Sequence, residues 1–432
     1  MSARPTAFIG ARLLDPETGY DGDGGLLARD GLIAEVWRGA DAPALSADVE
    51  RIEAAGACLA PGLVDLRVKS GEPGAESKET LESAARAAAA GGVTTIVVQP
   101  DTDPPIDDPA VADFILRRAR DVGLVRVYPA GAATKDLAGE AMAEIGLLAA
   151  AGCLYVTNAD RPIADTRLMR RILSYAGGLG VLVAHRPEDV WLAHGAAATE
   201  SEFSARLGLP GTPAVAESIM LERDLALADL TGARLLVDQI STAGAIESLA
   251  RAKARGLPVI ASASINHLSF NELDIGDYRT FCKLSPPLRG EGDRSALSRA
   301  VGEGLVDIVV SAHTPAPPEE KRLPYDEAAS GAVGLETLLS ALVSLHQQGE
   351  APLLRLIEAV TLAPARAVGL PAGRLARGAP ADLVLFDLDA PRVVDAAALV
   401  SRSKNSPFDG RRLQGEVLMT LVDGRRVFER AA

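Results

Sequence analysis

The sequence is poor in residues that form covalent cross-links or bind soft metals. It contains three cysteines, Cys58, Cys153 and Cys282, which are far apart and odd in number. This arrangement argues against a disulfide framework and against a thiolate zinc site, and it is typical of a reducing compartment. We therefore expect all three cysteines to be buried packing residues.

Other functional signals are absent as well. The N-terminal segment lacks a continuous apolar signal core, and no apolar run is long enough to span a bilayer. The net charge of −14 argues against binding to nucleic acids or to anionic membranes. Glycine-rich stretches lack the context of a phosphate loop, and no Ser-His-Asp or Cys-His set stands at suitable positions. We expect a cytoplasmic protein.

In the middle of the chain, short apolar segments alternate with stretches of helical periodicity. Short apolar, β-branched segments lie at 63–68, 94–98, 126–129, 154–157, 181–184, 234–237, 258–261 and 307–310. Stretches of helical periodicity, such as 79–90 and 243–254, separate them. Apolar strands without polar alternation are typical of a parallel sheet that is covered on both faces. Eight such units predict an α/β fold with a closed (β/α)₈ barrel.

The two ends of the chain differ from the middle. Residues 7–37 and 381–429 alternate short strands with turns, and the dipeptides Asp30-Gly31 and Asp423-Gly424 are strong hairpin signals. We expect both ends to pair into one small β-sandwich outside the barrel. The predicted boundaries are 1–60 and 373–432 for the two halves of the sandwich and 61–372 for the barrel.

The segment 61–69, Pro-Gly-Leu-Val-Asp-Leu-Arg-Val-Lys, is predicted to be a buried strand running into a loop. It resembles the opening strand of the cyclic amidohydrolases, above all the dihydroorotases. Further matching segments are Gly71-Glu72-Pro73-Gly74, Ala216-Glu217-Ser218, Ile240-Ser241-Thr242-Ala243-Gly244, Pro286-Pro287-Leu288-Arg289, Gly334-Leu335-Glu336-Thr337 and Ser403-Lys404-Asn405-Ser406-Pro407-Phe408. The resemblance covers nearly the whole chain and implies a TIM barrel of the amidohydrolase type, with zinc at the carboxyl ends of its strands.

The resemblance also implies that most zinc ligands have been replaced. Arg67 and Lys69 stand where the family has the two histidines of its Asp-x-His-x-His pattern. Asn158 stands where the family has a metal-bridging aspartate. Zinc requires neutral imidazole, thiolate or carboxylate donors, so two cations repel the metal.

The remaining strand ends follow the same trend. His185 keeps the family's metal histidine, whereas Gln239 replaces another one. Ala312 replaces the aspartate that serves as both ligand and general base, and general base catalysis contributes roughly 10²–10⁴-fold. We therefore predict no bound zinc, no other cofactor and no useful dihydroorotase turnover.

The substrate-binding positions have changed too. Gly71 replaces the arginine that grips the substrate carboxylate in the family, and Asp101 and Asp103 replace asparagines. Some relatives bridge their metals with a carboxylated lysine, and Arg126 is the approximately aligned residue. Each change removes a feature that an anionic cyclic amide would use.

Arg67 and Lys69 also suggest a structural hypothesis. With the period of two of a strand, Asp65, Arg67 and Lys69 share one face, which points into a closed barrel. The two cations would then occupy the space of the metals and neutralise Asp65, Asp101 or Asp103. The alternative is neutral drift after loss of function.

Three functions remain open at this point. Non-catalytic dihydroorotase homologues are structural partners of aspartate carbamoyltransferase in pyrimidine biosynthesis, so the resemblance implies a pseudoenzyme in a homo- or hetero-oligomer. A second interpretation is an active dihydroorotase with an atypical site. A third is a metal-independent enzyme in which His185 or His313 is the acid–base group. The simpler interpretation of both histidines is that they are hydrogen-bonded remnants, and we expect His267 to pack in the interior.

Overall fold

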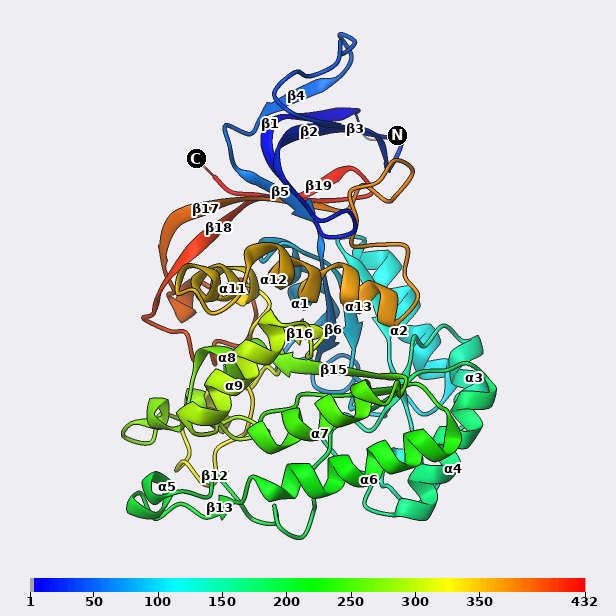
Figure 1. Cartoon of the computed structure of the whole chain (residues 1–432), viewed down its shortest axis with the longest axis vertical. Helices are drawn as coiled ribbons and strands as arrows, with labels where there is room; N and C mark the ends of the chain where they lie inside the picture. The colour runs from blue at the N-terminus through cyan, green and yellow to red at the C-terminus, as the bar shows by residue number, and fades with distance from the viewer. Residues whose placement is uncertain (1–3, 432) are drawn as a thin grey trace.

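A closed barrel of parallel strands forms the centre of the molecule (Figure 1). The computed structural model describes residues 4–431. The barrel strands are β6 (Leu63–Val68), β7 (Val93–Val98), β8 (Arg126–Pro129), β10 (Val156–Thr157), β11 (Val183–His185), β14 (Leu235–Val237), β15 (Val259–Ser264) and β16 (Ile308–Val310). The short strand β9 (Gly131–Ala132) follows β8 and pairs with β10. A parallel bridge between Val68 and His313 closes the barrel between its first and last strands. The predicted fold class is confirmed.

Helices surround the barrel and connect its strands (Figure 1). They are α1 (Leu81–Ala90), α2 (Pro109–Val122), α3 (Ile145–Ala150), α4 (Thr166–Gly178), α6 (Val215–Thr231), α7 (Ala243–Ala254), α9 (Glu291–Gly302), α11 (Leu338–Gln347), α12 (Leu353–Val360) and α13 (Leu362–Ala367). Local side chains start several of them. Thr80 and Ser83 form a reciprocal cap at α1, and Asp165 accepts two backbone N–H groups at the start of α4.

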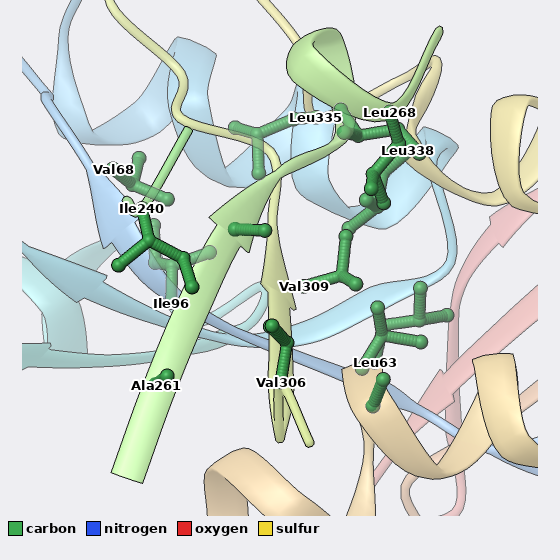
Figure 2. Close-up of a cluster of buried hydrophobic side chains, with 14 of the residues drawn as sticks. Leu63, Val68, Ile96, Ile240, Ala261, Leu268, Val306, Val309, Leu335 and Leu338 are labelled. Atoms are coloured by element: carbon green, nitrogen blue, oxygen red, sulfur yellow. The ribbon is translucent and has the colours of Figure 1, made fainter. Parts of the chain in front are cut away.

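Side chains on opposite faces of the strands form two apolar layers. Figure 2 shows part of the outer layer, in which Leu63, Val68 and Ile96 of the barrel belong to the same cluster as Leu335 and Leu338. The inner layer fills the barrel itself with residues of β6, β7, β11, β14 and β16 together with Ala365 and Ala367. The barrel is therefore a packed core whose free space lies only at its ends.

The two chain ends form one β-domain. Its strands are β1 (Thr6–Asp15), β2 (Tyr20–Arg29), β3 (Leu32–Arg38), β4 (Glu50–Glu53), β5 (Cys58–Pro61), β17 (Leu383–Val393), β18 (Arg412–Val422) and β19 (Arg425–Glu429). They hydrogen-bond as one sheet in the order β19-β18-β17-β5-β1-β2-β3, with β4 paired to β1. Residues of strands from both ends share one apolar cluster, so the two chain ends form a single domain, as predicted. The domain boundaries at 60/61 and 372/373 stay predictions.

Both predicted hairpin turns are present in this sheet. Asp30 and Gly31 have φ angles of 52° and 81°, and Asp423 and Gly424 have φ angles of 50° and 67°. Two successive left-handed residues match the right-handed twist of antiparallel strands, which explains the Asp-Gly sequences.

Short elements lie between the barrel strands and their helices. They are α5 (Glu202–Arg206), β12 (Ala198–Thr199), β13 (Gly211–Thr212), α8 (Ile265–Ser269), α10 (Pro318–Lys321) and the 3₁₀ turns η1 (Lys135–Leu137), η2 (Glu272–Ile275), η3 (Thr280–Cys282) and η4 (Ala396–Ala398). Cys58, Cys153 and Cys282 are free and buried, which confirms their packing role. Within residues 4–431, no helix has the length and apolar character needed to cross a membrane.

Candidate functional site at the barrel mouth

The strand-end residues singled out from the sequence gather at one end of the barrel. Arg67 is near the end of β6 and Lys69 follows it, Asn158 follows β10, and His185 ends β11. Gln239 and Ala312 come two residues after β14 and β16. Parallel strands place their carboxyl ends at the same side, so these positions surround the barrel mouth. These residues therefore lie at the barrel mouth, as the resemblance implies.

Arg67 is held inside the barrel mouth by two carboxylates. Its guanidinium forms ion pairs with Asp160 and Asp238, and its side chain is only 4% exposed. Gln99 Oε1 lies 3.5 Å from Nη1. Burial alone lowers the pKa of Arg67, but the charges of Asp238 and Asp160 outweigh burial and raise it. The guanidinium is therefore a permanent internal cation.

Lys69 extends the same network. Its Nζ lies 2.6 Å from Asp101 Oδ2 and also forms an ion pair with Asp160. Burial lowers the pKa of Lys69, whereas the charges of Asp101 and Asp160 raise it by more. Burial likewise raises the pKa of Asp160, but Lys69, Arg67 and Arg186 lower it well below the usual aspartate range. Asp160 is therefore an anion shared between two cations.

The prediction that Asp65 shares one face of the strand with Arg67 is wrong, because β6 is irregular between Asp65 and Val68. The pairing of β6 with β7 runs Asp65–Ile96 and then Val68–Val98, so the stretch between Asp65 and Val68 holds one residue more than its partner. Asp65 therefore shares the side of Ile96, and Arg67 is turned towards the mouth by the bulge. Asp65 accepts N–H groups from Arg67 and Ser311, and burial raises the pKa of Asp65 to about 6.

Arg67 and Lys69 do pair with carboxylates at the barrel mouth, but only one of the three expected partners is among them. Among the described residues, Arg67 and Lys69 form no ion pair with Asp65 or Asp103, whereas Asp101 pairs with Lys69 as expected. Asp160 and Asp238, the main partners, were not identified from the sequence. A signal was present, because Asp238 follows β14 directly and Asp160 comes two residues after Asn158.

His185 is locked by the protein on both sides of its ring. The backbone N–H of Ile163 donates to Nε2 at 2.8 Å, so that nitrogen is deprotonated and its lone pair is in use. The proton therefore lies on Nδ1, which donates to Asp224 Oδ2 at 2.6 Å. Arg223 pairs with the other oxygen of Asp224 at 2.6 Å. His185 has no lone pair left for a metal or for a substrate proton.

His313 is turned away from the mouth. Its Nδ1 accepts the N–H of Gly334 at 3.2 Å, and its Nε2 lies 3.5 Å from Glu79 Oε2. Both ring nitrogens therefore face buried protein groups. The backbone of His313 has a structural part as well, because its carbonyl accepts the N–H of Lys69 at 2.9 Å where the barrel closes.

The other replaced positions offer little chemistry. Asn158 Oδ1 accepts hydrogen bonds from the N–H and hydroxyl of Thr134, at 3.1 and 2.9 Å. Gln239 and Ala312 have φ angles of 54° and 53°, a left-handed conformation in which aspartate, asparagine and histidine are enriched. The backbone at both positions thus suits the histidine and aspartate that the resemblance implies, whereas the side chains present are an amide and a methyl group.

Almost no free space remains at the mouth. A cavity of about 10 Å³ lies between Asp160, Gln239, His267 and Ala312, which is roughly the volume needed by one water molecule. His267 Nε2 lies 3.0 Å from the Pro286 carbonyl, and burial lowers the pKa of His267 to about 4. His267 is buried and neutral, in accord with a packing role.

The residues at the mouth do not fit a divalent metal. The described part of the chain contains no group of three or more histidine, cysteine or acidic side chains placed to hold a metal ion. The carboxylates that are present are each engaged by Arg67 or Lys69. Arg126 does not stand at the position of the carboxylated lysine that some relatives have at the barrel mouth. It lies at the start of β8, at the opposite end of the strand, and pairs with Asp382 at 2.6 Å. That approximate alignment was wrong.

Solved structures identify the class of fold. L-hydantoinase (dihydropyrimidinase) from Arthrobacter aurescens superposes with a TM-score of 0.87 at 25% identity and covers 100% of this chain and 97% of its own. Dihydropyrimidinase from Brevibacillus agri gives a TM-score of 0.84 at 22% identity, over 98% of this chain and 95% of its own. An amidohydrolase family model matches residues 328–428. The fold is that of the amidohydrolases.

Sequence relatives narrow the class to a family. A dihydro-orotase-like family model matches residues 56–245. A dihydroorotase from Anaeromyxobacter sp. (strain K) is 43% identical over 97% of each chain, and one from Pelobacter propionicus is 39% identical over 97% of this chain and 98% of its own. The chain therefore belongs to the dihydroorotase family of the amidohydrolase superfamily.

Proposed function

We propose that this chain is a non-catalytic member of the dihydroorotase family. The observation that carries the proposal is the ion-pair network at the barrel mouth, where Arg67 and Lys69 hold Asp101, Asp160 and Asp238. Hydrolysis of a cyclic amide needs an activated water and a base. The mouth offers two cations in the expected metal positions and a methyl group in place of the base.

We further propose that the chain is a structural partner of an aspartate carbamoyltransferase. The support is the resemblance to non-catalytic homologues with that role, together with a complete and densely packed fold around a degenerate site. A chain that keeps such a fold without its chemistry needs another use for it, and a partner surface is the simplest use. The expected product is a hetero-oligomer in pyrimidine biosynthesis.

The first test addresses catalysis. The chain is purified without chelators, its zinc content is measured by elemental analysis, and both directions of the conversion between carbamoyl aspartate and dihydroorotate are assayed. We expect no stoichiometric zinc and no turnover above a blank, with a zinc-loaded dihydroorotase as positive control. Stoichiometric zinc together with turnover would reject the proposal.

The second test addresses partnership. The chain is co-expressed with the carbamoyltransferase of the same genome, and the mass of the purified complex is measured. We expect a defined hetero-oligomer, and a carbamoyltransferase that is less stable or misassembled when expressed alone. A carbamoyltransferase that assembles fully without this chain, and ignores it when mixed, would exclude the scaffold role.

An active cyclic amidohydrolase is the second candidate function. The specific observation in its favour is that the relatives at 39–43% identity are named dihydroorotases. The catalysis test separates the two, since the same assay gives turnover only in this case. A metal-free enzyme that uses His185 or His313 is less well supported, because backbone N–H groups occupy a ring nitrogen of each.

A further inference from the structure

The outer surface of α4 carries an unbalanced positive charge. The helix contains Arg167, Arg170 and Arg171 and no acidic residue, although the whole chain has a net charge of −14. All three arginines are exposed, and among the described residues none of them forms an ion pair. A positive surface of this kind stands out on a chain that is acidic as a whole.

These charges do not stabilise the helix that carries them. Arg167 lies in the first turn of α4, where the helix dipole favours anions. Arg170 and Arg171 follow it at spacings of three and four residues, at which like charges repel each other. On α1, by contrast, Arg86 pairs with Glu82 of the same helix. A partner outside the chain therefore explains the arginines of α4 better than the stability of the helix does.

Exposed apolar side chains lie beside the arginines. Tyr175 of α4 and Leu179, which follows it, are 44% and 49% exposed, and Leu147 of α3 is 57% exposed. The side chains of Tyr175 and Leu179 pack beside Gly146 of α3, so the two helices form one surface (Figure 1). Tyrosine and arginine are enriched in protein–protein interfaces. The α4 face is defined here as Leu147, Arg167, Arg170, Arg171, Tyr175 and Leu179.

We infer that the α4 face is the surface by which this chain binds its protein partner, and that the partner presents an acidic segment there. The inference rests on the proposed partnership with a carbamoyltransferase and adds the place of the contact. Carboxylates of the partner would meet the guanidinium groups, whose planar donors suit bidentate hydrogen bonds. An apolar side chain of the partner would cover Tyr175 and Leu179. Complementary charges of this kind speed association and fix the orientation of the partners.

Other occupants fit the α4 face less well. In a two-fold dimer of this chain the same surface lies on both sides of the interface, so arginines would face arginines. Nucleic acids and anionic membranes also attract arginine, but a net charge of −14 repels them from the chain as a whole. An acidic segment of limited size on another protein meets neither obstacle.

The test compares the natural chain with the α4 variant, Arg167→Glu with Arg170→Glu. The matched control is Arg299→Glu with Arg377→Glu, because both residues are exposed, lie outside α4 and form no ion pair among the described residues. Each variant replaces two positive charges by two negative ones. The Kd for the carbamoyltransferase of the same genome is measured by biolayer interferometry at low and at high NaCl concentration.

We expect the Kd to rise about 30-fold or more for the α4 variant and less than about threefold for the control, because each reversal replaces an attraction by a repulsion. High NaCl should weaken the natural complex more than that of the α4 variant. Equal Kd values for the natural chain and the α4 variant would overturn the inference and leave the proposed partnership standing. No binding by the natural chain would reject the partnership and the inference together.

Folding and the other occupants are checked on the same samples. The Tm of the α4 variant should stay within about 2 °C of the natural value, because the new carboxylates lie near the helix N-terminus and beside Arg171. Should it fail to fold, Arg167→Gln with Arg170→Gln takes its place, and an unchanged Kd for that neutral variant overturns the inference. A natural chain that is dimeric alone but monomeric as the α4 variant would show that a second copy occupies the face. Binding of a labelled RNA oligonucleotide or of phosphatidylserine vesicles that the α4 variant loses would likewise overturn the inference.

Discussion

Restoring the family's histidines to the first strand should damage this protein and leave it inactive. The perturbation is the double change Arg67→His and Lys69→His. In a dihydroorotase with intact ligands these residues would hold zinc, but here Arg67 and Lys69 already neutralise Asp160, Asp238 and Asp101. A shorter imidazole that is neutral above its pKa leaves these carboxylates without their partners.

The magnitude follows from the exposure of each pair. The side chains of Arg67 and Asp238 are 4% and 7% exposed, and breaking such a buried pair costs about 3–5 kcal/mol. The side chains of Lys69 and Asp101 are 20% and 24% exposed, so solvent screens this pair and about 1 kcal/mol is expected. The two costs sum to about 4–6 kcal/mol, and since both changes remove a partner of Asp160 this sum is the expected total only to within the usual coupling between neighbouring sites.

The loss should depend on pH with a definite sign. Histidines placed among carboxylates have a folded-state pKa above their unfolded value of about 6.5. Their stabilising charge is fully present below that value and is lost as the pH rises through the folded pKa. The double variant should therefore be closest to the natural chain near pH 5.5 and furthest from it near pH 8.5.

The assay is urea unfolding followed by circular dichroism at both pH values, with zinc analysis and dihydroorotase turnover measured on the same samples. Arg86→His serves as the exposed control. Under the proposed function no turnover is expected, because Asn158, Gln239 and Ala312 are left unchanged in this variant. Zinc-dependent turnover would refute the reasoning, and so would a stability that matches the control at both pH values.

The remaining predictions concern groups around the mouth. Burial lowers the pKa of Lys321 to about 7, so the folded chain binds fewer protons than the unfolded chain between pH 7 and the ordinary lysine pKa of 10.5. Urea unfolding should show stability rising across that window by up to about 1.4 kcal/mol per pH unit relative to Lys321→Met, and equal slopes would contradict this. Asp224→Ala removes the carboxylate that pairs with His185 and Arg223, and it should lower the free energy of unfolding by about 3–5 kcal/mol in the same assay. Asp229→Ala, at an exposed residue, should lower it little. Gly71→Arg should fail to restore the family's substrate contact and should lower Tm, because a Cβ there would meet the carbonyl oxygens of Ala75 and Glu79 at 2.6 and 2.7 Å; an unchanged Tm would show that the loop yields.

The fold could be predicted because strand, helix and turn patterns depend on the conformational preferences of neighbouring residues. The apolar segment 63–68 coincides with β6, and the helical pattern 243–254 coincides with α7, which begins after the capping residue Thr242. The Asp-Gly turns followed from backbone conformations that few residues adopt. Such signals need no knowledge of distant contacts.

The partners in the site could not be predicted in the same way. Asp160 and Asp238 lie far from Arg67 in the sequence, and only the closure of the barrel brings them to it. The extra residue between Asp65 and Val68 also breaks the strict alternation on which the shared face of Asp65 and Arg67 rested. Arg126 was compared with a lysine expected after the third strand, although the segment predicted at 126–129 already placed it at the start of that strand, where the structure also has it.

Similarity over the whole chain and chemistry at the mouth give separate kinds of information. An identity of 43% over 97% of each chain measures how well the barrel and the β-domain are kept, and hundreds of residues contribute to it. Catalysis depends on a few strand-end side chains, which barely affect that number. A relative's activity is therefore transferable only where those side chains agree. In this chain two of those positions, Arg67 and Lys69, form ion pairs with Asp101, Asp160 and Asp238. Zinc content and turnover measured on the natural protein therefore decide its function more directly than any further relative.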